Sequence, residues 1–136
     1  MKNSQGNTTR FPNKSNQHLS FGSATERAAC RFLEMKGLKL IMQNYSCKVG
    51  EIDLIMQDQD HIVFVEVRGR HRIDYGNAFE SIIPAKQKKL IRAATCFLQW
   101  KKCLYTVNSR FDIVALHPVN GQLTIEWIKN AFTTRW

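Results

Sequence analysis

Two carboxylates, Asp53 and Glu66, are the residues of this sequence whose surroundings point most directly to chemistry. Each belongs to a short and mostly apolar run, residues 51–56 and 62–68, and the polar tetrad 57–60 between the runs has the composition of a turn. The two runs therefore predict a pair of antiparallel strands with one carboxylate on each strand.

The register of this strand pair follows from its apolar residues. A turn centred between Gln59 and Asp60 sets one apolar face opposite another, whereas a slip of one residue destroys the match. The predicted opposed pairs are Ile52 with Val67, Leu54 with Val65, Met56 with Val63, Asp53 with Glu66, and Glu51 with Arg68. Directly opposed residues have Cβ atoms about 4.5–5.5 Å apart, so the two carboxylates are expected side by side.

Like charges held this close require a compensating cation. Mg²⁺ or Mn²⁺ is the expected one, because hard divalent ions take carboxylate oxygens and keep other positions for water and phosphate. Such an ion activates water and neutralises charge on a phosphodiester. Arg68 lies two residues beyond Glu66 on the same strand face and is expected in the same cleft. We therefore predict a metal site at Asp53 and Glu66.

A first helix is expected over residues 25–36. Ser23 and Glu26 have the spacing of a capping box, and Gly37 supplies a left-handed stop. At 100° per residue, one face of this helix gathers four apolar residues that we predict to pack on the core. They are Ala24, Ala28, Phe32 and Met35.

A second helix is expected from Pro84 to about Lys101. Its predicted packing face holds Leu90, Ile91, Ala94, Phe97 and Leu98, and its opposite, cationic face holds Lys88, Lys89 and Arg92. Further strands are expected at 38–45, 110–116 and 123–128. The order of helix, three strands, helix and two strands predicts an α/β fold, a single mixed sheet flanked by helices.

One folded domain accounts for residues 23–136, since a module of this size can bury a core of its own. Residues 1–22 are polar and contain no acid, and they predict a flexible basic arm. No apolar run approaches the ~20 residues of a membrane span, and the amino terminus lacks a signal-peptide pattern. We expect a cytoplasmic protein without a membrane partner.

Charge points to a polyanionic partner. The chain has 20 Lys and Arg against 11 Asp and Glu, a net charge of +9. Residues 68–102 contain nine basic and two acidic residues, a net +7. Such a surplus favours nucleic acid, with ribosomal RNA or anionic lipid as the less specific readings.

The cysteines and histidines do not form a zinc motif. Cys30, Cys47, Cys96 and Cys103 include no CxxC pair, and the four histidines include no pair with ligand spacing. Scattered thiols in a chain without an export signal are typically reduced and partly buried, which is what we expect here.

Asp53 followed by Glu66-x-Arg68 resembles the D…(D/E)xK signature of the restriction-endonuclease-like nucleases. A longer series of blocks resembles the YraN family of nuclease-like proteins, over roughly residues 22–116. The blocks are Gly22-x-x-x-Glu26, Gly50-Glu51-Ile52-Asp53-Leu54-Ile55, Val63-Phe64-Val65-Glu66-Val67-Arg68-Gly69-Arg70, Lys86-Gln87 and Arg110-Phe111-Asp112.

This resemblance implies a restriction-endonuclease-like core and a metal-dependent nuclease that hydrolyses phosphodiester bonds in DNA, including the branched or structured DNA on which some relatives of the fold act. It implies that Asp53 and Glu66 hold the metal, that Glu26 lies near it from the first helix, and that Gln87 approaches from the second. Residues expected to bind nucleic acid are Arg70, Arg72, Lys86, Gln87, Lys88, Lys89 and Arg92. Arg68 replaces the usual Lys and cannot serve as a base, so its expected catalytic role is electrostatic.

Several of these residues have structural alternatives. Glu26 could be only the capping-box partner of Ser23, Glu51 could form a cross-strand ion pair with Arg68, and the cationic helix face could be merely solvated. Asp112, in an otherwise apolar strand, is expected to be a structural anchor. The alternative function is a nucleic-acid-binding module of the same fold without hydrolysis. The oligomeric state is left open, a homodimer included.

Overall fold

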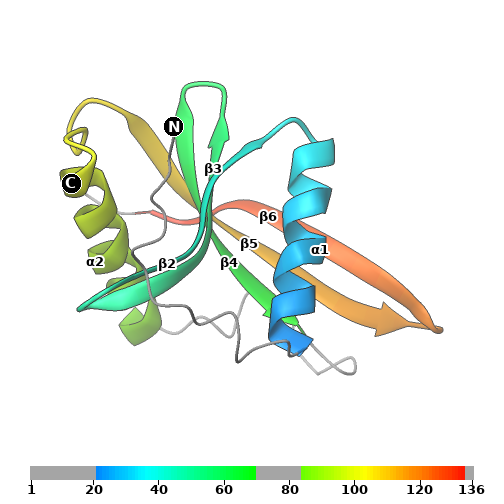
Figure 1. Cartoon of the computed structure of the whole chain (residues 1–136). Helices are drawn as coiled ribbons and strands as arrows, with labels where there is room; N and C mark the ends of the chain where they lie inside the picture. The colour runs from blue at the N-terminus through cyan, green and yellow to red at the C-terminus, as the bar shows by residue number, and fades with distance from the viewer. Residues whose placement is uncertain (1–20, 70–83, 134–136) are drawn as a thin grey trace.

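A mixed sheet of five strands lies between two helices in the computed structural model, which describes residues 21–69 and 84–133 (Figure 1). The elements are α1 (Phe21–Met35), β2 (Lys39–Cys47), β3 (Gly50–Asp58), β4 (His61–Gly69), α2 (Pro84–Trp100), β5 (Asn108–Val119) and β6 (Gln122–Phe132). The strands lie in sequence order, and only β4 and β5 are parallel. The predicted element order and the mixed-sheet α/β fold are confirmed.

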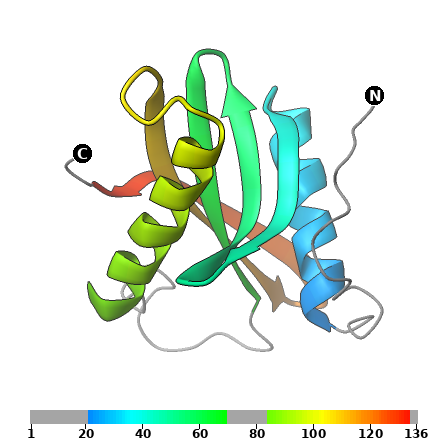
Figure 2. The ribbon, with the colours of Figure 1, turned by 60° about the vertical axis from the view of Figure 1, so that its left-hand side comes forward.

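Each helix covers one face of the sheet, because side chains alternate between the faces along each strand. α1 packs on a cluster that includes Leu54, Met56 and Val65, whereas α2 packs on a cluster that includes Ile55 and Phe64. Figures 1 and 2 show the helices on opposite sides of the sheet. Strands buried on both faces read as nearly continuous apolar runs, and β5 is buried throughout residues 111–116.

One expectation for α1 is wrong and another is confirmed only in part. The helix begins at Phe21, so Ser23 lies inside it and is not its N-cap residue. Its fully buried residues are Thr25, Ala29, Cys30 and Leu33, about one position from the predicted face. Of the four predicted residues, Ala28 and Phe32 are half-buried and pack against the same core, whereas Ala24 and Met35 are exposed. The alanines of this helix, Ala24, Ala28 and Ala29, fit either face almost equally well. The sequence alone therefore does not determine which face of the helix packs on the core.

The end of α1 agrees with the expectation. Gly37 has a φ of 101°, and the amide of Leu38 donates a hydrogen bond of 3.1 Å to the carbonyl of Leu33. This six-to-one hydrogen bond around a left-handed glycine is a Schellman motif, which satisfies a carbonyl that the helix leaves without an internal partner.

The β3–β4 register is confirmed over most of its length. Leu54 pairs with Val65 and Met56 pairs with Val63, around a turn where Gln59 has a φ of 58°. The paired register runs from Asp58 and His61 only as far as Leu54 and Val65. Ile52 departs from the prediction, because it packs in the α2 cluster while Val67 packs on the α1 side.

The predicted packing face of α2 is largely confirmed. Leu90, Ala94, Phe97 and Leu98 are buried, as is Ala93, and Ile91 is half-buried at the border of the face. Lys88, Lys89 and Arg92 are exposed, as expected for the cationic face. Among the described residues, no helix is long and apolar enough to cross a membrane.

Both edge strands of the sheet are irregular. In β2 the register shifts between Leu40 and Met42, and Asn44 has a left-handed φ of 55°. In β6 the register shifts where Asp112 of β5 alone opposes residues 129–131, and Asn130 has a φ of 55°. Asparagine tolerates the left-handed region better than most residues, which explains its presence at both bends.

Candidate active site

Asp53 and Glu66 lie where the β3–β4 ladder ends. Directly beyond the last pair, an Asp53 carboxylate oxygen (Oδ2) accepts a hydrogen bond of 2.8 Å from the backbone amide of Val67. This bond takes the place of a ladder hydrogen bond, so the predicted direct pairing of Asp53 with Glu66 is wrong in its backbone detail. The two carboxylates still interact, since Glu66 is one of the charges that act on Asp53.

Glu26 approaches the same carboxylate from α1. It forms side-chain hydrogen bonds with Asp53 and with Asn44 of β2, and burial raises its pKa. A hydrogen bond between two carboxyl groups requires a proton on one of them. Glu26 therefore belongs to the acidic site, as the family resemblance implied, and the capping-box alternative fails because Ser23 is not an N-cap residue. Asn44 is a site residue that the sequence did not reveal.

Burial and the neighbouring charges of Glu66 and Glu26 raise the pKa of Asp53 to about 8, against the lowering effect of the Val67 amide and Lys86. A carboxyl group with such a pKa holds its proton near neutral pH. A cation placed beside it would oppose this shift, because it favours the charged form of the carboxyl group.

The stability of the ion-free protein should therefore depend on Asp53. Because the folded pKa is raised, the stabilisation is complete below pH 4 and is lost as the pH rises to about 8. One pKa unit corresponds to about 1.4 kcal/mol. Urea unfolding in EDTA should show Asp53→Asn to be more stable than the wild type by a few kcal/mol at pH 8.5, with the difference shrinking towards pH 5. A difference that does not change with pH would contradict the raised pKa.

Two cations meet the buried Glu66 carboxylate. Its Oε2 lies 3.2 Å from Nζ of Lys86, near the start of α2, and 3.7 Å from Nη1 of Arg68 on its own strand. Glu66 is 9% exposed, so its charge is costly without such partners. The sequence placed Lys86 among the nucleic-acid-binding residues, and its direct ion pair with Glu66 was not foreseen.

Gly50 explains how α2 comes close enough to deliver Lys86. A side-chain carbon at Gly50 would lie 3.2 Å from the backbone oxygen of Lys89, which is tighter than ordinary contact. The glycine thus lets the start of β3 pack directly on α2 (Figure 2). This contact lies three residues from Asp53 and three from Lys86, and it ties the two sides of the site together.

The predicted nucleic-acid-binding residues divide into three groups. Lys88, Lys89 and Arg92 form an exposed row on α2, and Gln87 beside them is half-buried. Lys86 lies at the acidic site itself. Arg70 and Arg72 lie outside the described residues.

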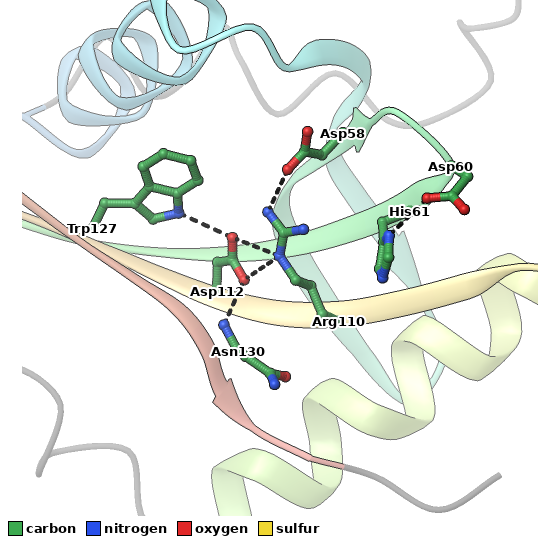
Figure 3. Close-up of polar contacts among 7 residues, drawn as sticks. All are labelled: Asp58, Asp60, His61, Arg110, Asp112, Trp127 and Asn130. Carbon is green, nitrogen blue, oxygen red and sulfur yellow. Dashed lines mark hydrogen bonds and ion pairs between the residues drawn. The ribbon is translucent and has the colours of Figure 1, made fainter.

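Asp112 is a structural anchor, as the sequence predicted. Its carboxylate accepts hydrogen bonds from Nε of Arg110 (3.0 Å), Nε1 of Trp127 (2.9 Å) and the backbone amide of Asn130 (2.9 Å) (Figure 3). Arg110 also donates through Nη2 to Asp58 at 2.9 Å. The network closes the β6 bulge and ties β5 to the β3–β4 turn. Asp112 thus has a full set of protein partners and is not available for a ligand.

The acidic site suits a hard divalent ion in its donor type. Asp53, Glu66 and Glu26 offer only carboxylate oxygens, which Mg²⁺ and Mn²⁺ prefer. Among residues 21–69 and 84–133, however, no three side chains of His, Cys, Asp or Glu form a ready-made metal centre. An ion here would rest on Asp53 and Glu66 and take its other ligands from water or phosphate, as is common for Mg²⁺.

Comparison with known proteins places this chain among sequence relatives. The model of the family described as "Uncharacterised protein family UPF0102" matches residues 25–116, which is most of the folded chain. The chain belongs to the UPF0102 family. This is the YraN family that the sequence blocks indicated. The matched residues include the acidic site, Lys86 and the Asp112 anchor.

Individual UPF0102 proteins are similar over nearly their whole length. The UPF0102 protein of Ectopseudomonas mendocina is 47% identical over 115 residues, which cover 85% of this chain and 96% of the relative. That of Nitrosococcus oceani is 43% identical over 115 residues, 85% of this chain and 93% of the relative. That of Alkalilimnicola ehrlichii is 43% identical over 124 residues, 91% and 95% of the two chains.

Proposed function

We propose that this UPF0102 chain is a Mg²⁺- or Mn²⁺-dependent nuclease that hydrolyses phosphodiester bonds in DNA. The observation that carries the proposal is the convergence of Asp53, Glu66 and Glu26 where the β3–β4 ladder ends, directly beside the cations Lys86 and Arg68. A fold gains no stability from crowding three carboxyl groups, so a function of the group is the simplest reason for it.

The proposed roles follow from the contacts. Asp53 and Glu66 would hold the ion, and Glu26 would keep its proton or orient Asp53 through their hydrogen bond. When bound, the ion would supply an activated water and neutralise charge on the phosphodiester. The Val67 amide fixes one oxygen of Asp53 and leaves the other for a further partner.

The two cations would serve the substrate. Arg68 is 24% exposed and Lys86 is 48% exposed along their side chains, so both can reach solvent from Glu66. Arg68 cannot act as a base at physiological pH, but its guanidinium can hold a phosphate and stabilise the charge that develops on it. Lys86 can do the same as a point charge.

Divalent-metal titration by calorimetry tests the metal site. We expect Mn²⁺ to bind the wild type with a measurable heat, and Asp53→Asn or Glu66→Gln to weaken binding at least about tenfold, because each removes a charged oxygen ligand. Glu34→Gln is the matched control, since Glu34 is an exposed glutamate on α1. Equal heats in the wild type and both site variants would refute the metal site.

The exposed basic row of α2 gives a second, independent test. Lys88 and Lys89 should contact phosphates, so the double charge reversal Lys88→Glu and Lys89→Glu should lower the slope of log affinity for DNA against log salt by about 1 to 2 units. Reversal of Lys36 and Lys39, exposed at the junction of α1 and β2, is the control. A slope that is the same in both double variants would mean that the α2 row is only solvated.

A nucleic-acid-binding module without hydrolysis is the second candidate. Its support is that Lys86 and Arg68 already pair with Glu66, which reduces the need for a metal ion at this carboxylate. The same basic row would bind DNA in either case. A DNA cleavage assay distinguishes the nuclease from the binding module, whereas a DNA-binding assay does not.

A further inference from the structure

One face of α2 follows the end of β2 and the start of β3. Near the end of α2, the ring of Phe97 meets the ring of Tyr45 edge to face at 5.4 Å. Nearer its start, the backbone of Lys89 and the side chain of Ala93 lie against Gly50. The strand thus runs along the helix from its end towards its start (Figure 2). Residues between Tyr45 and Gly50 therefore lie near the helix segment between Ala93 and Phe97.

Cys47 and Cys96 meet between these two contacts. A side-chain hydrogen bond joins the two thiols, and a second one joins Cys47 to Tyr45. Both cysteines are free, half-buried and packed at the border of the α2 cluster. They are 49 positions apart in the sequence, so tertiary packing alone brings them together.

We propose that Cys47 and Cys96 form a redox-responsive dithiol that closes to an intramolecular disulfide on exposure to a peroxide. The sequence spacing excluded a CxxC redox motif, and this pair is a different arrangement, assembled from a strand and a helix. The proposal is independent of the nuclease assignment, because it rests on residues outside the acidic site.

The overall reaction converts two thiols and one hydrogen peroxide into a disulfide and two water molecules, and it is a single two-electron oxidation that proceeds in two steps. The thiolate of one cysteine attacks the peroxide, its sulfur is oxidised to sulfenic acid, and one water leaves. The second thiolate attacks that sulfur, the disulfide bond forms, and the hydroxyl leaves as a second water. Burial and the neighbouring Cys47 raise the pKa of Cys96, which slows its attack on peroxide.

Closure would bind α2 covalently to β2. The bond would lie just beyond the Gly50 contact that sets α2 against β3, the two elements that carry Lys86 and Asp53. A cross-link between positions far apart in the sequence restricts the unfolded chain. Because the two thiols already interact, the folded protein needs little rearrangement to form the bond. The oxidised protein should therefore melt several degrees higher than the reduced one.

The test is mild oxidation of the full chain with hydrogen peroxide, followed by denaturation, alkylation of free thiols and mass spectrometry. We expect the chain to lose the mass of two hydrogen atoms, two of its four cysteines to resist alkylation, and the cross-linked peptides to contain Cys47 and Cys96. Dithiothreitol should restore both thiols and return the melting temperature to that of the reduced protein.

Single substitutions identify the pair. Cys47→Ser or Cys96→Ser should abolish the disulfide and the rise in melting temperature, whereas Cys103→Ser, at another half-buried thiol, should preserve both. Peptide mapping of the wild type decides the matter even if a serine variant fails to fold. A cross-link through Cys30 or Cys103, a disulfide between chains, or oxidation to sulfinic acid without a cross-link would overturn the proposal.

Discussion

The Glu66→Gln protein is expected to lose Mn²⁺-dependent DNA cleavage by about 10³-fold or more while still binding DNA. Glu66 would supply a charged ligand to the ion and hold Lys86 and Arg68 in place, so its neutralisation removes electrostatic stabilisation at the reacting phosphate. Binding should be unchanged or tighter, since one negative charge facing the phosphates has gone. The measurement is cleavage of linear, flapped and four-way DNA, with binding measured in Ca²⁺.

Substitutions of Arg68 make the cleavage test more specific. Arg68→Ala should reduce cleavage sharply, whereas Arg68→Lys should retain or raise it, because lysine keeps the positive charge beside Glu66. The Glu66→Gln protein, purified identically, controls for contaminating nuclease. If the wild type and Glu66→Gln are equally inactive on every substrate yet bind DNA equally well, the enzyme proposal fails and the binding module stands.

The second large effect concerns stability. Asp112→Ala should destabilise the fold by about 3–5 kcal/mol, the range for removing one partner of a buried ion pair. It would leave the Arg110 guanidinium, 14% exposed, with Asp58 alone, and it would deprive the Trp127 and Asn130 donors of their acceptor. Urea unfolding followed by circular dichroism measures the loss.

Asp60→Ala is the matched control for that measurement. Asp60 is also an aspartate in an ion pair, with His61 at 3.0 Å, but its side chain is 78% exposed (Figure 3). Exposed pairs contribute about 0–1 kcal/mol, so this variant should unfold nearly as the wild type does. Similar losses in Asp112→Ala and Asp60→Ala would show that the buried network does not anchor β6.

The sequence predicted the strand pair well because its information was redundant. Leu54, Met56, Val63 and Val65 lie opposite one another in only one register, and a slip of one residue would have broken that match. The same logic failed at Ile52, because the ladder stops where the Asp53 side chain captures the Val67 amide. Apolar periodicity carries no information about a hydrogen bond between a side chain and the backbone.

The helices show the same difference between what the sequence pattern can predict and what it cannot. The packing face of α2 was predictable because large apolar residues define it. The face of α1 was predicted only in part, because Ala24 and Ala29 have the same side chain and only Ala29 is buried. The position of Lys86 beside Glu66 could not be predicted from a sequence pattern, because it depends on the close approach of α2 to β3 that Gly50 allows. Asp53, Glu66 and Glu26 were identified, but their mutual arrangement required the tertiary structure.

The bends in β2 and β6 have a consequence for the behaviour of the protein in concentrated solution. Among the described residues, these strands form the two edges of the sheet, and the backbone groups of an edge strand can recruit strands from other molecules and begin aggregation. Asn44 and Asn130 each place a left-handed residue in an edge strand. The register also shifts in β2 between Leu40 and Met42, and in β6 around Asn130. Neither edge offers a long flat template, so the fold carries its own protection against edge-to-edge polymerisation.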